Sequence, residues 1–259
     1  RDRERSILIS RVMKRASTSI IGPRRIGKTW LMNYLVLMAP TQLGSNYRVG
    51  YLNASSPNCS TIEKFTNQAL QSLGASFRKP SRTNEGLTLL EAAMAELVTK
   101  KQIPVLCIDE FEGLGDSKMF NLEFFTGLRA LAQTGLVLVV ASKNPLVYIV
   151  SDHLIKASPF FNIFEQITLK PFTLTEAETF VQTKSAQAGF NEREKEAFLQ
   201  YGRIGEKEWS PLRLQLVGKM LQEDKHFAGG KEMGYLSPDS HLYWQDFEKR
   251  LDEVYVGSV

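Results

Sequence analysis

The chain has 259 residues, 43% of them hydrophobic and 23% charged, and this composition excludes a disordered or fibrous protein. The formal net charge is +4, a mild basicity that suits a nucleic-acid partner without requiring one. The two cysteines have no metal-ligand spacing and make no disulfide framework, which favours a reducing, cytoplasmic location. The most apolar stretch, residues 136–150, is short and interrupted by polar residues, so we expect a soluble protein without a membrane span.

The chain begins abruptly at Arg1 without an initiator methionine, so we expect it to be a piece of a longer protein. Up to residue 171, short apolar runs alternate with helical patterns, which predicts βαβ units and a mainly parallel sheet. The predicted strands cover residues 17–21, 47–52, 103–108, 136–141 and 166–169. Helical periodicity predicts the helices of this part at residues 28–37, 60–74, 85–100 and 121–132.

Beyond residue 171 only helical patterns follow, so the character of the sequence changes there. We therefore predict two domains: an α/β core with a parallel sheet at residues 1–171, and an all-helical domain at residues 172–259. Within the second domain, residues 225–238 are rich in glycine, lysine and serine and predict a loop.

Cap signals predict where several helices start. Ser60 with Glu63, and Thr175 with Glu178, have the spacing of a capping box. In this motif the side chain of each residue accepts a hydrogen bond from the backbone N–H of the other. Asn191 predicts the start of a charged helix in the second domain.

A phosphate-binding loop is predicted after the first strand. Gly22, Gly27, Lys28 and Thr29 match the pattern G-x-x-x-x-G-K-[ST]. The two glycines let the backbone wrap closely around phosphate, and the N–H groups of the loop and of the following helix attract the anion. Lys28 is expected to reach the β- and γ-phosphates, and the Thr29 hydroxyl to bind Mg²⁺.

An acidic pair ends the third predicted strand. Ligand sites in parallel sheets lie at the carboxyl edge of the strands, which is where Asp109 and Glu110 fall. Asp109 is expected to hold Mg²⁺, and Glu110 to activate the attacking water as general base. Glu112 is the weaker candidate for the base, because Glu110 lies closer to the end of the strand.

Polar residues also follow the fourth predicted strand. Ser142, Lys143 and Asn144 come directly after a fully apolar run, and a buried strand beside the acidic one would carry them toward the γ-phosphate. One of the three is expected to sense that phosphate, and the sequence does not choose among them.

Together these motifs resemble the additional-strand P-loop ATPases. Within them, the loop sequence Gly-Pro-Arg-Arg-Ile-Gly-Lys-Thr resembles the archaeal-type ATPases and the signalling (STAND) NTPases, relatives of AAA+ and Orc-like proteins. The resemblance implies that the loop binds ATP through Gly22, Pro23, Arg24, Arg25, Ile26, Gly27, Lys28, Thr29 and Trp30. Arg1, Glu4 and Leu8 resemble a segment that lies near the adenine in this group.

The second domain resembles the helical lid of these proteins. Ser210 followed by Pro211 predicts a helix with proline in its first turn, and this helix falls where the family places a nucleotide contact. Either Pro211 or Arg213 is implied to make that contact. In AAA+ rings a neighbouring subunit supplies an arginine finger, for which Arg129 is a candidate, although a solvated arginine is the simpler interpretation.

The resemblance implies a regulatory, slowly hydrolysing Mg²⁺-dependent ATPase whose ATP-bound form assembles into a homo-oligomer and signals through fused or partner effector domains. The alternative is a DNA-associated ATPase of the origin-binding or transposon-regulator type, which Arg11, Lys14 and Arg15 would favour. A binding-only scaffold would not need Glu110, and a metabolic kinase would need an arginine-rich lid.

Overall fold

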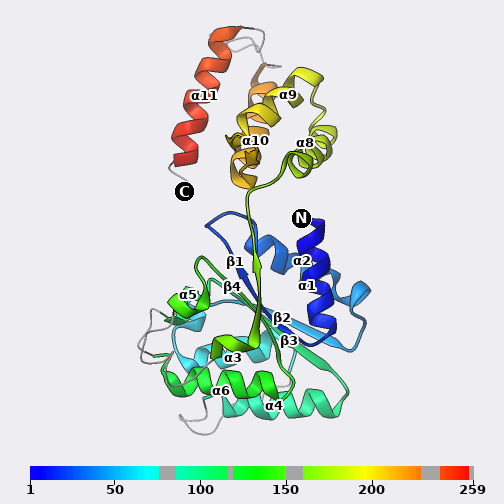
Figure 1. Ribbon diagram of the computed structural model, residues 1–259, viewed down its shortest axis with the longest axis vertical. Coiled ribbons are helices and arrows are strands. Elements are labelled where there is room, and N and C mark those ends of the chain that lie inside the picture. Colours follow the sequence, from blue (N-terminus) through cyan, green and yellow to red (C-terminus); the bar gives the residue numbers. More distant parts are fainter. Residues whose placement is uncertain (76–85, 116–118, 150–159, 229–239, 257–259) are drawn as a thin grey trace. The chain divides into compact units, whose positions relative to one another are not determined.

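The structure is a computed structural model that describes residues 1–75, 86–115, 119–149, 160–228 and 240–256. By its internal contacts the chain divides into two compact units, and Figure 1 labels most of their helices and strands. The first unit comprises Asp2–Pro23 and Gly27–Leu169. The second comprises Lys170–Val259 together with Arg1 and Arg24–Ile26.

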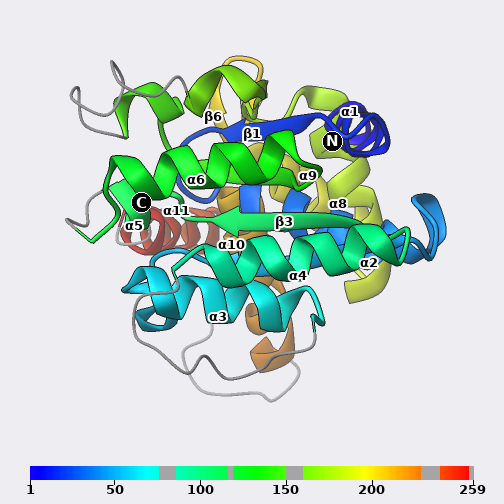
Figure 2. The same ribbon diagram turned by 90° about the horizontal axis from the view of Figure 1, so that it is seen from below.

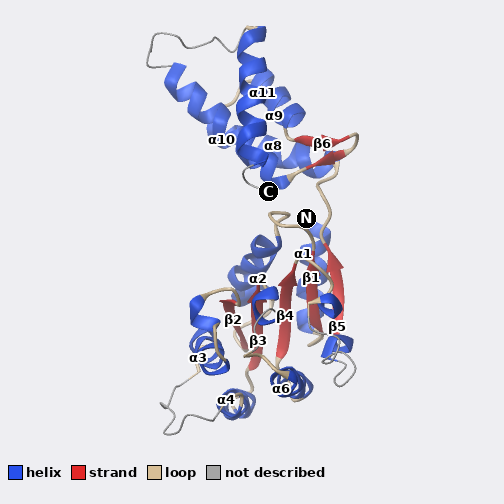
Figure 3. Cartoon of the chain, turned by 90° about the vertical axis from the view of Figure 1, so that its left-hand side faces the viewer, coloured by secondary structure: helices blue, strands red, loops and turns tan. Residues whose placement is uncertain are grey.

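A five-stranded parallel sheet forms the centre of the first unit, with the strand order β2-β3-β4-β1-β5 (Figure 3). The strands are β1 (Ser17–Ile21), β2 (Tyr47–Asn53), β3 (Ile103–Asp109), β4 (Val137–Ser142) and β5 (Phe164–Thr168). The additional strand β4 lies between the strand before the phosphate loop and the strand before the acidic pair. The predicted α/β fold of the additional-strand type is therefore confirmed.

Helices cover both faces of this sheet. They are α1 (Asp2–Met13), α2 (Lys28–Gln42), α3 (Ile62–Ser72), α4 (Thr88–Thr99), α5 (Glu112–Gly115) and α6 (Leu122–Gln133). Figure 2 shows α3, α4 and α6 in front of the sheet, and α2 packs against β2, β3 and β4. Short 3₁₀ turns occupy Pro57–Cys59, Leu146–Tyr148 and Phe160–Ile163.

The main core of the first unit lies between the sheet and the helices α3, α4 and α6. On β3, the side chains of Leu106 and Ile108 point into this core and are fully buried. The residue between them points to the other face of the sheet, because side chains alternate along a strand. Phe65 and Phe124 meet edge to face with ring centroids 5.2 Å apart. Every residue of β3 is buried, as expected for a strand covered on both faces.

The capping box predicted at Ser60 is wrong, because the helix begins later. Thr61 is the N-cap of α3, and its hydroxyl accepts from the backbone N–H of Lys64. The 3₁₀ turn Pro57–Cys59 ends at Ser60, so Ser60 closes that turn and the next residue begins the helix.

Two other helices of the first unit differ in length from the prediction. α2 continues to Gln42 with Pro40 inside its last turn, whereas the prediction ended at residue 37. α4 begins at Thr88. The prediction began at Glu85, which lies outside the described residues.

The second unit is mainly helical, as predicted, but the prediction that it contains only helices is wrong. Its helices are α8 (Leu174–Ala188), α9 (Glu192–Tyr201), α10 (Pro211–Ala228) and α11 (His241–Val256). Between α9 and α10, the strands β6 (Arg203–Gly205) and β7 (Glu208–Trp209) pair antiparallel. These strands are too short for an alternating pattern to reveal them.

The second predicted capping box is shifted by two residues. Thr173 and Glu176 form the box at the start of α8, in place of Thr175 and Glu178. The predicted cap at Asn191 is confirmed, and its side chain accepts from the N–H of Glu194.

The loop predicted at residues 225–238 is helical in its first part, because α10 extends to Ala228. Residues 229–239 lie outside the described part of the chain. Among the described residues, no helix is long and apolar enough to cross a membrane.

Candidate nucleotide-binding site

The phosphate loop joins β1 to the first turn of α2. Gly27 has φ 106 and is the N-cap of α2, but it has no side chain to cap the helix. The N–H groups of the first turn, which carry the positive end of the helix dipole, are therefore left for an anion. Arg25 also has a positive φ, 61, whereas Ile26 between it and Gly27 does not. An alternation of left-handed and right-handed backbone turns successive N–H groups toward one point, where they can bind an anion.

Lys28 lies inside this loop. It is 6% exposed, and its ammonium donates to the carbonyls of Gly22 (2.8 Å) and Pro23 (3.0 Å). A buried ammonium needs such acceptors, and it can exchange them for phosphate oxygens. The contact of Lys28 with phosphate stays a prediction.

Asp109 and Thr29, which are 80 positions apart in the sequence, meet at this end of the sheet. Thr29 Oγ1 donates to Asp109 Oδ2 at 2.6 Å. Asp109 is 1% exposed, and its other oxygen, Oδ1, accepts from the backbone N–H of Glu110 at 2.9 Å. The structure thus brings together the two predicted metal-binding residues.

Tyr51 is a member of the site that the sequence analysis did not identify. Its phenol donates to Asp109 Oδ2 at 3.0 Å from the neighbouring strand β2. Burial, and after it the Asp109 carboxylate, raise the pKa of Tyr51 well above its ordinary value. A tyrosine in a strand is ordinarily interpreted as a packing residue, so only the strand order could have indicated this contact.

Glu110 and Glu112 lie on either side of Phe111 and have different surroundings. Glu110 is half-buried and has φ 49, a left-handed backbone that is costly for a side chain and recurs at functional sites. Glu112 accepts from the backbone N–H of Lys143, while its Oε2 is buried with no hydrogen-bond partner among the described residues. Glu112 therefore holds the tip of β4, whereas Glu110 remains the prediction for the base.

The three candidate sensors differ in exposure. Ser142 is fully buried at the end of β4, and its hydroxyl donates to the carbonyl of Asn144 at 2.7 Å. The side chains of Lys143 and Asn144 are exposed. The backbone of this strand end is tied to the phosphate loop, since Gly22 donates to the Ser142 carbonyl at 3.3 Å.

The predicted contacts with the rest of the nucleotide fall on separate parts of the chain. Trp30 is 48% exposed on α2 and stacks on Tyr34, and the Arg5 guanidinium lies 4.3 Å from its ring centroid. Arg24 and Arg25 are exposed, and Ile26 is buried.

Arg1, Pro211 and Arg213 belong to the second unit. Arg1 donates to the carbonyl of Lys170, and Pro211 is the first residue of α10.

The guanidinium of Arg213 has three partners among the described residues of the second unit. Its guanidinium donates to the carbonyl of Tyr201 at 2.7 Å, pairs with Asp252 at 2.7 Å and lies over the ring of Tyr255. Its contact with a nucleotide stays a prediction. Arg129, the candidate arginine finger, is half-buried on α6, and within the described part of the chain its Nε has no hydrogen-bond partner.

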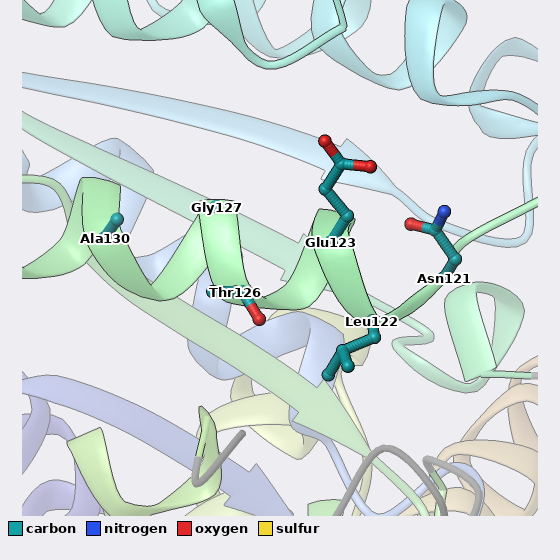
Figure 4. A pocket seen from close by; sticks show the side chains of 6 residues that line it. All are labelled: Asn121, Leu122, Glu123, Thr126, Gly127 and Ala130. Atoms are coloured by element: carbon teal, nitrogen blue, oxygen red, sulfur yellow. The ribbon is translucent and has the colours of Figure 1, made fainter. Parts of the chain in front are cut away.

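Two hollows of the first unit lie away from these residues. One, of about 810 Å³, is lined from α3, α4 and α6, and contains Glu63, Glu91 and Glu123. The other, of about 600 Å³, runs along α6 from Asn121 to Ala130. Figure 4 shows Asn121 and Glu123 projecting to one side of this helix and Leu122 to the other. Neither hollow contains a residue of the phosphate loop or the acidic pair.

Comparison with protein families gives one match. A family model described as an AAA domain matches residues 11–146, which is just over half of the chain. This span includes the phosphate loop, the acidic pair and the tip of β4. A comparison with curated proteins finds no match.

Solved structures of archaeal proteins resemble the chain over nearly its full length. The ORC2 protein of Aeropyrum pernix, in ADPNP-ADP complexes, is 16% identical with a TM-score of 0.69, over 96% of this chain and 66% of that one. The Walker-type ATPase PABY2304 of Pyrococcus abyssi is 15% identical with a TM-score of 0.67, over 99% and 72%. The A. pernix ORC1 protein in complex with DNA is 12% identical with a TM-score of 0.64, over 98% and 65%.

At these identities the likeness concerns the fold. The chain spans just under two thirds of the length of the two ORC proteins.

Proposed function

The chain belongs to the AAA domain family, and we propose that it is an ATP-binding and ATP-hydrolysing regulatory switch of the STAND and AAA+ type. In this proposal the nucleotide state controls self-association or signalling to a partner. The observation that supports it best is the hydrogen bond between Thr29 and Asp109, because it joins the two proposed metal ligands beside the proposed phosphate loop.

ATP is proposed to bind with its phosphates at the loop between β1 and α2. The uncapped first turn of α2 supplies backbone N–H donors, and Lys28 supplies a positive charge that is already buried there. The sequence contains no Asn/Thr-Lys-x-Asp motif for reading guanine, which favours ATP over GTP.

Mg²⁺ fits the residues that are present. Thr29 and Asp109 offer a hydroxyl and a carboxylate oxygen, which are the hard ligands that Mg²⁺ prefers. The described residues contain no cluster of three or more His, Cys, Asp or Glu side chains. Mg²⁺ at a nucleotide site needs none, since phosphate and water oxygens complete its coordination. When bound, the ion would neutralise charge on the phosphates.

Hydrolysis is proposed to use Glu110 as the general base. The residue follows Asp109 directly at the carboxyl edge of β3, and its half-buried carboxylate can accept a proton from water. Its strained backbone supports a functional role, since a helical or extended conformation would cost less.

Switching is proposed to involve the second unit. A ligand shifts a conformational equilibrium only as far as it prefers one arrangement, so ATP must contact both units to move them. Pro211 and Arg213, in the first turn of α10, are the proposed reporters. Arg213 would exchange one of its present partners, Tyr201, Asp252 or Tyr255, for the nucleotide.

DNA association is the second candidate function. It is favoured by the net charge of +4 and by the likeness to an ORC1 protein whose structure was solved with DNA. Of the basic residues predicted for it, Lys14 and Arg15 are exposed. Arg11 instead pairs with Glu165 at 2.8 Å, which reduces its availability to phosphate.

The mass of the protein in solution tests both proposals. It is measured with ADP and with a non-hydrolysable ATP analogue, each with and without duplex DNA, and the Lys28→Ala variant serves as the control. The switch predicts assembly with the analogue alone and none in the variant. Assembly that requires DNA and falls steeply with salt would favour the second candidate instead. One unchanged mass under all four conditions would contradict both.

A further inference from the structure

Tyr51 and Asp109 lie on the same face of the sheet. The parallel register pairs Tyr51 with Cys107, and Asp109 follows two residues later on β3. Because side chains alternate between the faces of a strand, these three point to one side. Leu52, Leu106 and Ile108 point to the other, into the core beneath α3. Tyr51 therefore faces α2, the helix that carries Thr29.

Among the residues that the structure describes, three donors from different elements hold the Asp109 carboxylate. Oδ2 accepts from Tyr51 at 3.0 Å and from Thr29 at 2.6 Å, and Oδ1 accepts from the N–H of Glu110 at 2.9 Å. An ionised carboxylate offers about four acceptor positions, so these donors leave about one. Thr29 is itself a proposed metal ligand, so Tyr51 is the side-chain donor to Asp109 from outside the metal site.

We infer that Tyr51 is a positioning residue that orients the Asp109 carboxylate for Mg²⁺. The inference rests on the proposed function, because it assigns Asp109 to the metal. Partners of metal-binding carboxylates restrict the rotation of the carboxylate, and their loss lowers metal affinity. The competing explanation is that Tyr51 only fills space and its hydroxyl takes the nearest acceptor. The two explanations differ in what the hydroxyl alone contributes.

The test is the Tyr51→Phe variant, which keeps the ring and removes the donor. Binding of a fluorescent ATP analogue is measured first with a chelator and then over a Mg²⁺ titration. We expect the Mg²⁺ concentration at half-effect to rise about 10-fold, the lower end of the range for outer-shell partners, with unchanged affinity in chelator. Tyr47→Phe is the matched control on the same strand, since Tyr47 donates to Met13 and should leave the midpoint unchanged.

An unchanged Mg²⁺ midpoint in Tyr51→Phe would overturn the inference, as would an equal loss of affinity with and without metal. A double-mutant cycle provides the second check: with Asp109→Ala in place, which leaves the Tyr51 hydroxyl no side-chain acceptor at this position, removing that hydroxyl should have no further effect on the metal midpoint. An independent effect would show that Tyr51 acts elsewhere. Failure of the proposed function is distinguishable, because the wild-type protein would then bind no analogue in either condition. Thermal unfolding of each variant confirms that it is folded.

Discussion

Thr29 Oγ1 donates to Asp109 Oδ2 at 2.6 Å, and this contact joins the first turn of α2 to the end of β3. The strand order makes this contact possible, because β1 and β3 flank β4 and their carboxyl ends lie at the same edge of the sheet. Backbone bonds hold that edge in register: Gly22 donates to Ser142, and Phe111 donates to Ala141. The phosphate loop and the acidic pair are therefore supported by the strand between them.

Replacing Lys28 with alanine should abolish nucleotide binding. The ammonium is expected to make two charge-assisted hydrogen bonds to phosphate, each contributing roughly 1.5–3 kcal/mol, so the affinity should fall more than about 100-fold. Titration with a fluorescent ATP analogue measures the loss. The control is Lys64→Ala, which removes an exposed lysine of α3 whose ammonium contacts Ser60. If Lys28→Ala retains the wild-type affinity, the phosphate site is misplaced.

Replacing Glu110 with glutamine should leave ATP binding intact and stop turnover. General-base catalysis contributes about 10²–10⁴-fold, so steady-state phosphate release should fall by that factor. Glu112→Gln is the matched control, since the glutamine carbonyl can still accept from the Lys143 N–H. Equal hydrolysis in Glu110→Gln and the wild type would remove Glu110 from the mechanism, and a larger loss in Glu112→Gln would transfer the role.

The elements that the sequence predicted well are those with long or fully apolar patterns. The strand ending in Asp109 was predicted within one residue, because seven consecutive buried positions admit few other structures. The phosphate loop was predictable because each of its residue types has a physical requirement. The helix caps were harder. At Thr61 and Thr173 the correct cap stands one or two residues from an equally suitable serine or threonine, and at Thr61 the preceding 3₁₀ turn decides between them.

Contacts between neighbouring strands lay beyond the sequence analysis. Tyr51 reaches Asp109 only because β2 pairs with β3 in one particular register, and no local pattern records that pairing. The short strands β6 and β7 were missed for a related reason. They contain three and two residues, and they are defined by their pairing with each other and by the bridge between Trp209 and Phe172.

The two cysteines should be unreactive in the native protein. Cys59 and Cys107 are 1% and 0% exposed, and burial raises the pKa of both thiols, that of Cys107 to about 12. The thiolate is the reactive form. At pH 8 about a quarter of an ordinary thiol with a pKa near 8.5 is ionised, but only about one part in ten thousand of a thiol with a pKa of 12. A soluble disulfide reagent should therefore label both cysteines only in denaturant, and rapid labelling of the folded chain would contradict their burial.

The second unit should depend on Asp224 for its stability. This carboxylate is 8% exposed on α10, and it accepts from the Tyr243 hydroxyl at 2.8 Å and from both terminal nitrogens of Arg250, at 2.9 and 3.2 Å. The network joins α10 to α11, and the hydrogen bonds from Arg250 to Asp224 raise the pKa of Arg250 above its ordinary value. Asp224 was not singled out by the sequence analysis, because an acidic residue in a charged helix is ordinarily solvated.

Replacing Asp224 with alanine should lower the free energy of unfolding by roughly 1–3 kcal/mol. Breaking a fully buried pair costs about 3–5 kcal/mol, but the Arg250 side chain is 39% exposed, so water recovers part of the loss. Urea unfolding of the variant and of the wild-type protein measures the difference in the free energy of unfolding. Glu223→Ala is the control on the adjacent position, because its pair with Lys219 is exposed and 3.6 Å long and should contribute less than about 0.5 kcal/mol. Equal stability of the two variants would mean that α11 is held by its apolar residues alone, with Phe247 and Leu251 sufficient to dock it.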